Sequence, residues 1–151
     1  MQLPERVDVV IVGGGVMGTS SAFHLSEAGV SVALFEANEL ASGSTSKAAG
    51  GVRANFSDEL NIALGARSLD LLAKFQQRPG YEIDLHRPGY LFALTNNEDV
   101  ALFERSTKLH HQYGVESRMI SPTEARSISP LLSEEGVIAC SFTPNDGHCT
   151  P

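Results

Sequence analysis

The first 36 residues alternate between short apolar runs and a helical pattern of apolar positions. Residues 7–12 form a Val/Ile run broken only by Asp8, which is typical of a parallel strand buried on both faces. The apolar spacing over residues 16–28 predicts a helix, and Gly29 is a suitable residue to end it. A second apolar run at residues 30–35 predicts another strand. This order predicts a parallel βαβ unit.

The rest of the chain alternates between helical patterns and short apolar runs. We expect a helix over residues 58–77, capped by Ser57 or Asp58, because an apolar stripe recurs there at a spacing near 3.6. The further expected elements are two short antiparallel strands or an extended pair at 81–86 and 89–94, a helix at 97–113 opened by a capping box in Thr95-Asn96-Asn97-Glu98, a strand at 115–120, a short helix to residue 128 opened by Ser121-Pro122-Thr123-Glu124, a strand at 136–143 and a turn at 144–147.

The character of the pattern changes near residue 80. Before it, the chain reads as a parallel α/β unit, and beyond it the short runs favour a more antiparallel α+β arrangement. We therefore predict an α/β fold with a Rossmann-type unit in residues 1–80 and part of a second, α+β domain in residues 81–151.

A glycine-rich turn joins the first predicted strand to the first predicted helix. Gly13 permits a tight turn, Gly15 lets the backbone approach a pyrophosphate, and Gly18 lets the helix lie close to the strand. The helix N-terminus offers free N–H groups to phosphates, and Glu36, at the end of the second strand, can accept a hydrogen bond from a ribose hydroxyl. We name residues 13–18 the glycine clamp and predict dinucleotide contacts from all of it: Gly13, Gly14, Gly15, Val16, Met17 and Gly18. The alternative is a βαβ unit whose glycines serve only packing.

A segment without bulky side chains follows at residues 41–51. Ten of its eleven residues are Ala, Ser, Gly or Thr, and the exception is Lys47. Such a segment can bring its backbone against a flat cofactor and offer N–H and hydroxyl groups to it. The alternative is a flexible surface loop. The predicted cofactor contacts are Ser42, Ser44, Thr45, Lys47, Ala49, Gly50 and Gly51.

Few other side chains suggest chemistry. Arg53 could approach the cofactor or bind a substrate carboxylate, although an ion pair or a place on a helix surface would explain it equally well. His110 and His111 are adjacent on a predicted helix and face different directions, so we expect no metal site from them. Tyr90 could line a pocket, and the sequence assigns no role to His148.

Composition narrows the classes of partner. The formal net charge is −7 and no basic stripe is visible, which argues against nucleic acid. No apolar run reaches the length of a membrane span. The first strand begins too near the N-terminus for a signal or transit peptide, so we expect a cytoplasmic protein. Cys140 and Cys149 are expected to be reduced thiols.

Residues 9–36 and 42–53 together resemble the D-amino-acid oxidase superfamily of FAD-dependent oxidoreductases. The most similar branch is that of glycine oxidase, sarcosine oxidase and dimethylglycine dehydrogenase. Weaker agreement comes from residues 87–91, 121–125 and 146–151, so the resemblance extends over essentially the whole chain.

The resemblance implies FAD, with the glycine clamp at the pyrophosphate, Glu36 at the adenosine ribose and residues 42–51 towards the flavin. It also implies an enzyme that oxidises the C–N bond of a small amino acid or an N-methylated glycine by hydride transfer to the flavin, after which the imine hydrolyses. Some relatives attach the flavin through a histidine in this segment. Lys47 stands at the corresponding place, so the resemblance implies noncovalent FAD.

Family members are much longer than this chain. The resemblance therefore implies an N-terminal portion, namely an incomplete FAD-binding βαβ unit joined to part of a substrate domain, whose partners would be a C-terminal half or further subunits. An open sheet edge and apolar helix faces favour aggregation. We expect the 151 residues alone to precipitate, to bind FAD poorly and to be inactive.

Two other functions are compatible with parts of the sequence. An NAD-linked dehydrogenase would explain the glycine clamp and Glu36, but it leaves residues 41–51 without a role and fits the region after residue 80 poorly. A non-catalytic nucleotide-binding subunit would explain why no complete set of catalytic residues can be assembled.

Overall fold

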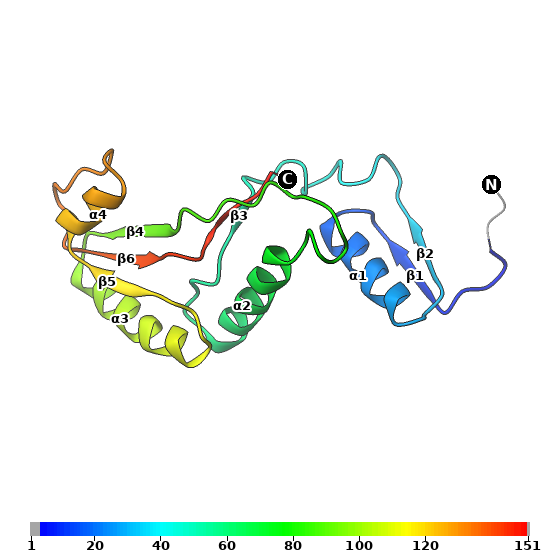
Figure 1. Ribbon diagram of the computed structural model, residues 1–151, viewed down its shortest axis with the longest axis horizontal. Coiled ribbons are helices and arrows are strands. Elements are labelled where there is room, and N and C mark those ends of the chain that lie inside the picture. Colours follow the sequence, from blue (N-terminus) through cyan, green and yellow to red (C-terminus); the bar gives the residue numbers. More distant parts are fainter. Residues whose placement is uncertain (1–3, 151) are drawn as a thin grey trace. The chain divides into compact units, whose positions relative to one another are not determined.

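The computed structural model describes residues 4–150 (Figure 1). These residues divide into two compact units, residues 4–49 and 50–150. The first unit contains β1 (Val9–Val12), α1 (Val16–Glu27) and β2 (Val32–Phe35). The second contains β3 (Gly51–Val52), α2 (Glu59–Ala73), β4 (Tyr90–Leu94), α3 (Asn97–Gln112), β5 (Arg118–Ile120), α4 (Pro122–Ile128), β6 (Ala139–Thr143) and β7 (Gly147–His148). The domain boundary near residue 80 stays a prediction.

The first unit is a parallel βαβ unit, which confirms the predicted fold class at this point. β1 and β2 pair in parallel register from Val9 opposite Val32 to Val12 opposite Phe35, and α1 connects them. The Asp8 carboxylate accepts hydrogen bonds from the N–H and hydroxyl of Ser31 beside this ladder. The first strand therefore has its parallel neighbour next to it in space, as the apolar runs predict.

The prediction that β1 is buried on both faces is wrong for this structure. Val12 is 87% exposed and Val10 is 57% exposed. Within the described residues the sheet of this unit has two strands, β1 and β2. A parallel strand becomes buried on both faces only where further strands flank it and helices cover both sides. The apolar surface of β1 is consistent with the expected tendency to aggregate.

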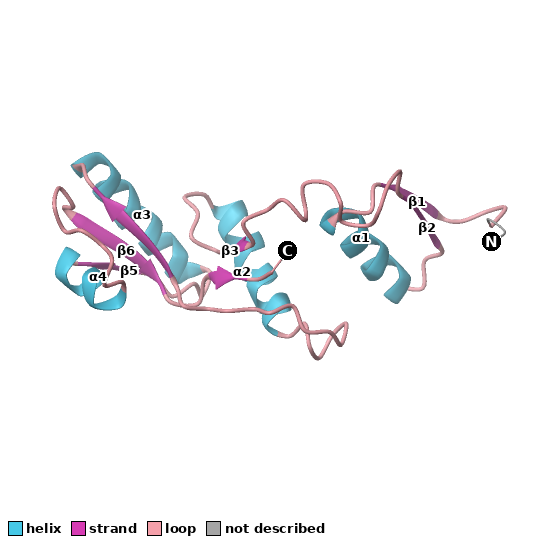
Figure 2. Cartoon of the chain, turned by 90° about the horizontal axis from the view of Figure 1, so that it is seen from above, coloured by secondary structure: helices cyan, strands magenta, loops and turns pink. Residues whose placement is uncertain are grey.

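The second unit is built on a three-stranded antiparallel sheet of order β4-β6-β5. Tyr90 to Leu94 of β4 pair with Thr143 to Ala139 of β6, and β5 pairs with the other edge of β6. Helix α3 lies along this sheet, and α4 lies at one end of it (Figures 1 and 2). The mixed α+β pattern predicted after residue 80 therefore forms around one central strand, β6.

Two apolar clusters form the core of this unit. Ala54, Ile62, Leu69 and Val115 make up the first, which lies between α2 and the chain before β5. Ile120, Ala125, Cys140 and Phe142 make up the second, next to the sheet. Cys140 is a buried free thiol, and burial raises its pKa. The apolar positions of the sequence thus account for the core of the second unit.

The predicted strand at residues 81–86 is wrong. Only His86 pairs, in an isolated bridge with His148, while β4 takes β6 as its partner. The bridge places Gly147 so close to the chain that a Cβ there would overlap the His86 carbonyl oxygen. Local alternation could not reveal these partners because they lie far along the chain.

The bounds of other elements shift by a few residues. Helix α2 ends at Ala73 rather than at residue 77, and strands β5 and β6 begin later than predicted.

Three helices have side-chain caps, two at residues that the sequence predicted and one displaced by a single residue. Asp58 accepts the Asn61 N–H at 3.0 Å, and Ser121 accepts the Glu124 N–H at 3.1 Å with Pro122 in the first turn. The capping box predicted for Thr95 and Glu98 is displaced by one residue. Asn96 is the cap of α3, and its Oδ1 accepts the Asp99 N–H at 2.8 Å.

This shift predicts unequal effects of two neighbouring substitutions. Asn96→Ala is expected to lower the free energy of unfolding by about 1 kcal/mol, because it removes a side-chain cap. Thr95→Ala, which leaves that cap in place, is the matched control and should lower it by much less. Urea unfolding followed by circular dichroism measures both. A larger loss for Thr95→Ala would place the cap at Thr95 instead.

Candidate functional site

The glycine clamp forms a tight turn between β1 and α1. Gly13 has a φ of +106°, a conformation that residues with a Cβ rarely adopt, and its N–H donates to the Phe35 carbonyl at 2.8 Å. A Cβ on Gly18 would overlap the Gly13 carbonyl oxygen. The clamp therefore depends on glycine at both positions, and α1 begins directly against the end of the strand.

Thr45 caps the start of α1 from the small-residue segment. Gly15 is the N-cap residue and has no side chain for this purpose, and the Val16 N–H donates instead to Thr45 Oγ1 at 3.0 Å. A Cβ on Gly15 would lie 3.1 Å from that hydroxyl. The Ala41 N–H also donates to the Gly14 carbonyl at 3.0 Å. These contacts place the segment next to the glycine clamp, a relation that no sequence rule for caps would predict.

Glu36 holds the clamp from the end of β2. Its Oε2 accepts the Gly14 N–H at 2.7 Å, and its Oε1 accepts the Asn38 N–H at 2.9 Å. These backbone donors, chiefly Gly14, lower the pKa of the Glu36 carboxyl. An ionised carboxylate therefore lies at the clamp, where the sequence predicts a ribose contact.

The start of α1 has the chemistry that a phosphate needs. Among the residues that the structure describes, the N–H groups of Met17 and Gly18 have no hydrogen-bond partner. Free N–H groups at a helix N-terminus and the helix dipole both favour an anion. The glycine clamp thus fits the pyrophosphate of a dinucleotide, with Glu36 beside it. That these residues bind a cofactor stays a prediction.

The other predicted cofactor residues are less closely tied to the clamp. Ser42, Ser44, Lys47 and Ala49 are exposed, and the Ser42 hydroxyl donates to the Glu39 carbonyl. Gly50 and Gly51 belong to the second unit, where the Gly50 carbonyl accepts the Cys149 N–H at 2.9 Å. The structure therefore brings Thr45 to the clamp and leaves the side chains around it facing solvent.

Arg53 lies in the second unit, between β3 and α2, and its guanidinium contacts aromatic rings. Its Cζ is 5.2 Å from the ring centre of Phe56, 5.4 Å from that of Tyr90 and 5.7 Å from that of Phe92. We name these three rings the Arg53 cage. Arg53 is not on a helix surface, and among the described residues it makes no salt bridge. Both alternative explanations from the sequence therefore fail, and the guanidinium keeps donors for an anion.

Arg53 also lines a pocket of about 350 Å³ that runs along α2. Gly51 and Phe56 line the same pocket, so the end of the small-residue segment and the arginine share one hollow. Tyr90, considered as a pocket residue from the sequence, contributes to the cage instead.

Two buried titratable groups near Arg53 were missed by sequence reasoning. Asp146 is 0% exposed, and its two carboxylate oxygens accept the N–H groups of Ala54 and Asn55 at 3.0 and 3.3 Å. Burial raises the pKa of the Asp146 carboxyl, against the opposing effect of these N–H groups and of the charges of His110 and Arg53. Asp146 belongs to a Pro-Asn-Asp-Gly sequence that a turn explains completely, so no local signal indicated its burial.

His110 is also fully buried and makes two hydrogen bonds. Its Nε2 lies 2.7 Å from the Phe56 carbonyl oxygen and its Nδ1 lies 2.8 Å from the Ser117 hydroxyl. The neutral ring meets both partners, with Nε2 as donor and Nδ1 as acceptor. Burial lowers the pKa of His110, although the Phe56 carbonyl and Asp146 act in the opposite direction. The sequence suggested only a possible metal site for the His110-His111 pair, which the spacing excluded, and it therefore did not indicate this role.

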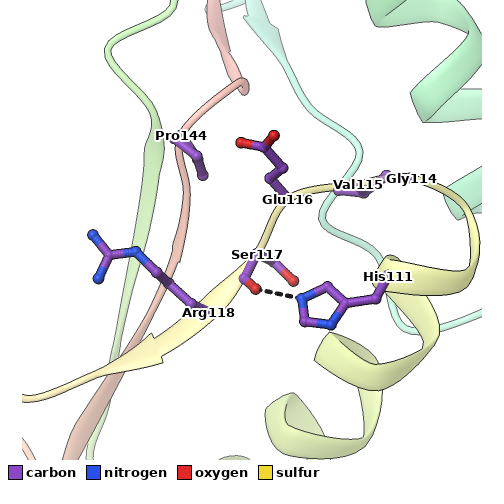
Figure 3. A pocket seen from close by; sticks show the side chains of 7 residues that line it. All are labelled: His111, Gly114, Val115, Glu116, Ser117, Arg118 and Pro144. Carbon is purple, nitrogen blue, oxygen red and sulfur yellow. Dashed lines mark hydrogen bonds between the residues drawn. The ribbon is translucent and has the colours of Figure 1, made fainter.

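A second pocket of about 380 Å³ lies where α3 passes into β5 (Figure 3). His111 Nε2 donates to the Ser117 carbonyl at 2.8 Å on its wall. Arg118, which also lines it, pairs with Glu124 and lies over the Phe142 ring. The charge of Arg118 is therefore engaged within the fold, and we assign no function to this pocket.

Comparison with known proteins identifies the family. The family model described as "FAD dependent oxidoreductase" (DAO) matches residues 8–151. The chain therefore belongs to this family of FAD-dependent oxidoreductases, which confirms the resemblance and the cofactor class expected from the sequence.

Particular relatives agree with this membership. The chain is 33% identical over 152 residues to human mitochondrial dimethylglycine dehydrogenase, covering 99% of this chain and 17% of that protein. The crystal structure of L-proline dehydrogenase from P. horikoshii matches with a TM-score of 0.91 and 37% identity, over 99% of this chain and 39% of that one. Glycine oxidase from Geobacillus kaustophilus matches with a TM-score of 0.80 and 28% identity, over 96% of this chain and 41% of that one. The chain thus spans well under half the length of these relatives.

None of the helices in the described part of the chain is long and apolar enough to cross a membrane. The cytoplasmic location expected from the sequence stays a prediction, and the human dimethylglycine dehydrogenase named above is described as mitochondrial.

The lowered pKa of His110 predicts a pH dependence of stability. The folded protein binds this proton less well than the unfolded chain does. The contribution of the neutral His110 to the free energy of unfolding is therefore fully present above pH 6.5, the ordinary pKa of histidine. It is lost as the pH falls from there through the lower pKa of the folded state. Urea midpoints measured from about pH 7.5 to about pH 5.5 should fall more steeply for the wild type than for His110→Gln.

Ile120→Val, which changes the core of the same unit without changing a titratable group, is the control for this measurement and should keep the wild-type pH dependence. Equal slopes for wild type and His110→Gln would show that His110 does not contribute in this range.

Proposed function

We propose that the protein carrying this chain is an FAD-dependent dehydrogenase or oxidase that oxidises the C–N bond of a small amino acid or an N-methylated glycine. The observation that carries the proposal is the match to L-proline dehydrogenase over 99% of this chain at 37% identity and a TM-score of 0.91. The similarity to dimethylglycine dehydrogenase supports the same class of substrate, an amino acid with a secondary or tertiary amine.

In this proposal the first unit binds the cofactor through backbone groups. The N–H groups of Met17 and Gly18 donate to the pyrophosphate, and the absence of a Cβ at Gly13 and Gly15 lets it approach. Glu36 accepts a hydrogen bond from the adenosine ribose while it keeps Gly14 in place. FAD, when bound, supplies the two-electron acceptor for the oxidation.

The segment around Lys47 supports noncovalent binding. The resemblance puts Lys47 at the place where some relatives carry a flavin-linked histidine, and its side chain is exposed and able to approach a phosphate. Its neighbour Thr45 caps α1 and so holds this part of the segment close to the glycine clamp. A mass measured after denaturation should therefore show the unmodified chain.

The second unit contributes the group that recognises the substrate. Arg53 presents a planar guanidinium with free donors, and a carboxylate is the ligand that such a fork binds best. The rings of the Arg53 cage attract the guanidinium and restrict its motion. An α-amino acid held by its carboxylate would present its C–N bond in a defined orientation.

Anaerobic titration tests this function directly. The protein that carries this chain, purified at full length, should show a visible flavin absorbance band that bleaches on addition of at least one of proline, sarcosine, dimethylglycine or glycine. Lactate, which has the carboxylate but no amine, is the control and should leave the band unchanged. A protein that carries flavin but is bleached by none of the amines would contradict the proposed substrate class.

The ribose role of Glu36 can be separated from its role in the turn by comparing two flavins. Glu36→Ala should weaken FAD binding by about 10-fold or more, as expected for loss of a charge-assisted hydrogen bond. FMN lacks the adenosine half, so its weaker affinity should change little if Glu36 acts on the ribose. Fluorescence titration measures both.

Glu36→Gln keeps one oxygen for the Gly14 N–H and should lie between wild type and Glu36→Ala. An equal loss for FAD and FMN would mean that Glu36 acts only through the Gly14 turn, and unchanged FAD affinity would remove its proposed role.

A further inference from the structure

The short segment Ala54–Phe56 has no helix or strand of its own and is held by side chains from distant parts of the second unit. Asp146 accepts the N–H groups of Ala54 and Asn55, and His110 donates to the Phe56 carbonyl at 2.7 Å. Backbone groups in a buried segment need such partners. Two titratable side chains, rather than a ladder of backbone bonds, therefore determine where this segment lies.

The burial of Asp146 is not required by the turn that contains it. A turn of this composition works with an exposed aspartate, and an isolated buried carboxylate is costly. Here both oxygens are used by N–H groups of the segment, and the side chain is 0% exposed. The cost of burial is offset only while the segment stays in place, so Asp146 and the segment depend on each other.

The same segment is tied to the sheet beneath the Arg53 cage. Asn55 Nδ2 donates to Thr143 Oγ1 at 2.6 Å and lies 3.5 Å from Ser141 Oγ. In the β4–β6 ladder, Thr143 is opposite Tyr90 and Ser141 is opposite Phe92. Directly opposite residues of an antiparallel pair project to the same face. The anchors of the segment and two of the cage rings therefore share two rungs of one ladder.

These hydrogen bonds affect the position of Arg53, because Arg53 directly precedes the segment in the chain. A long arginine side chain has many rotamers, and its direction depends on where its backbone lies relative to the rings. Asp146 lies near enough for its charge and that of Arg53 to affect each other, yet the two form no salt bridge among the described residues. The guanidinium is thus held in place without its donors being used.

We propose that Asp146 is a positioning residue, whose carboxylate holds the backbone of Ala54 and Asn55 so that Arg53 stays in its cage and binds the substrate carboxylate. This inference rests on the proposed function, because it assigns the substrate carboxylate to Arg53. His110 and Asn55 support the same arrangement through the Phe56 carbonyl and the β4–β6 ladder.

A double-mutant cycle with Arg53→Met tests the proposal in the purified full-length protein that carries this chain. In Asp146→Asn, an amide NH₂ replaces one oxygen and faces a backbone N–H, so at least one anchor is lost. We expect the KM for an amino-acid substrate to rise by about 10-fold with little change in kcat. In the Arg53→Met background, Asp146→Asn should add almost nothing further. Independent, additive effects would overturn the positioning role.

Two control variants separate positioning from a general loss of stability. Asn145→Ala changes the exposed neighbour in the same turn, and Ile120→Val changes the second apolar cluster. Both should keep the wild-type KM. If Asp146→Asn proves too unstable to purify, Thr143→Val removes the nearer acceptor of the Asn55 amide and should raise KM in the same way, though less. An unchanged KM in Thr143→Val and Asp146→Asn would overturn the proposal.

A readout without turnover distinguishes this proposal from the proposed function. Hydrogen exchange of a peptide containing Ala54 and Asn55 should become about 10-fold faster in Asp146→Asn. Acetate should slow the modification of Arg53 by phenylglyoxal in the wild type and give no protection in the variant. If no amino acid reduces the flavin but both results hold, the proposed function fails and the positioning role stands. Equal exchange and equal protection in both proteins overturn the positioning role alone.

Discussion

Hydrogen bonds that backbone N–H groups donate to carboxylates hold one irregular segment in each unit, the glycine clamp in the first and residues 54–56 in the second. Glu36 accepts the Gly14 N–H within the glycine clamp, and Asp146 accepts the N–H groups of Ala54 and Asn55 beside Arg53. A backbone that leaves helix or strand geometry loses its regular partners and needs others. In both units an acidic side chain from elsewhere in the chain supplies them.

The two carboxylates differ in surroundings. Glu36 is reached by solvent, and its N–H donors lower its pKa, so it is readily kept ionised. Asp146 is enclosed, and burial raises its pKa in spite of similar donors. An exposed carboxylate can exchange one of its partners for a ribose hydroxyl, whereas an enclosed one stays committed to the backbone it holds. This difference agrees with a ligand-binding role for Glu36 and a positioning role for Asp146.

Local patterns predicted most of the elements and the turn that the glycine clamp forms. Apolar periodicity placed β1, α1 and β2, and the glycine spacing indicated the clamp, because tight turns and close helix–strand packing require glycine wherever they occur. The same approach failed for residues 81–86, where alternation suggested a strand next to β4. The ladder instead joins β4 to β6. Strand pairing between distant segments depends on which edges meet in space, and a local window holds no information on that.

The sequence by itself indicated a dinucleotide site, since the spacing of the glycine clamp and Glu36 can be read within a local window, and its resemblance to the family indicated FAD. Only the tertiary structure decided what surrounds Arg53. Its three cage rings come from two separate segments, and Asp146 reaches the backbone next to it from more than ninety positions along the chain. Hydrogen bonds and ring contacts of this kind arise when distant segments fold onto each other. Local sequence therefore indicated only a turn at Asp146 and a rejected metal pair at His110, whereas the tertiary structure buries both side chains.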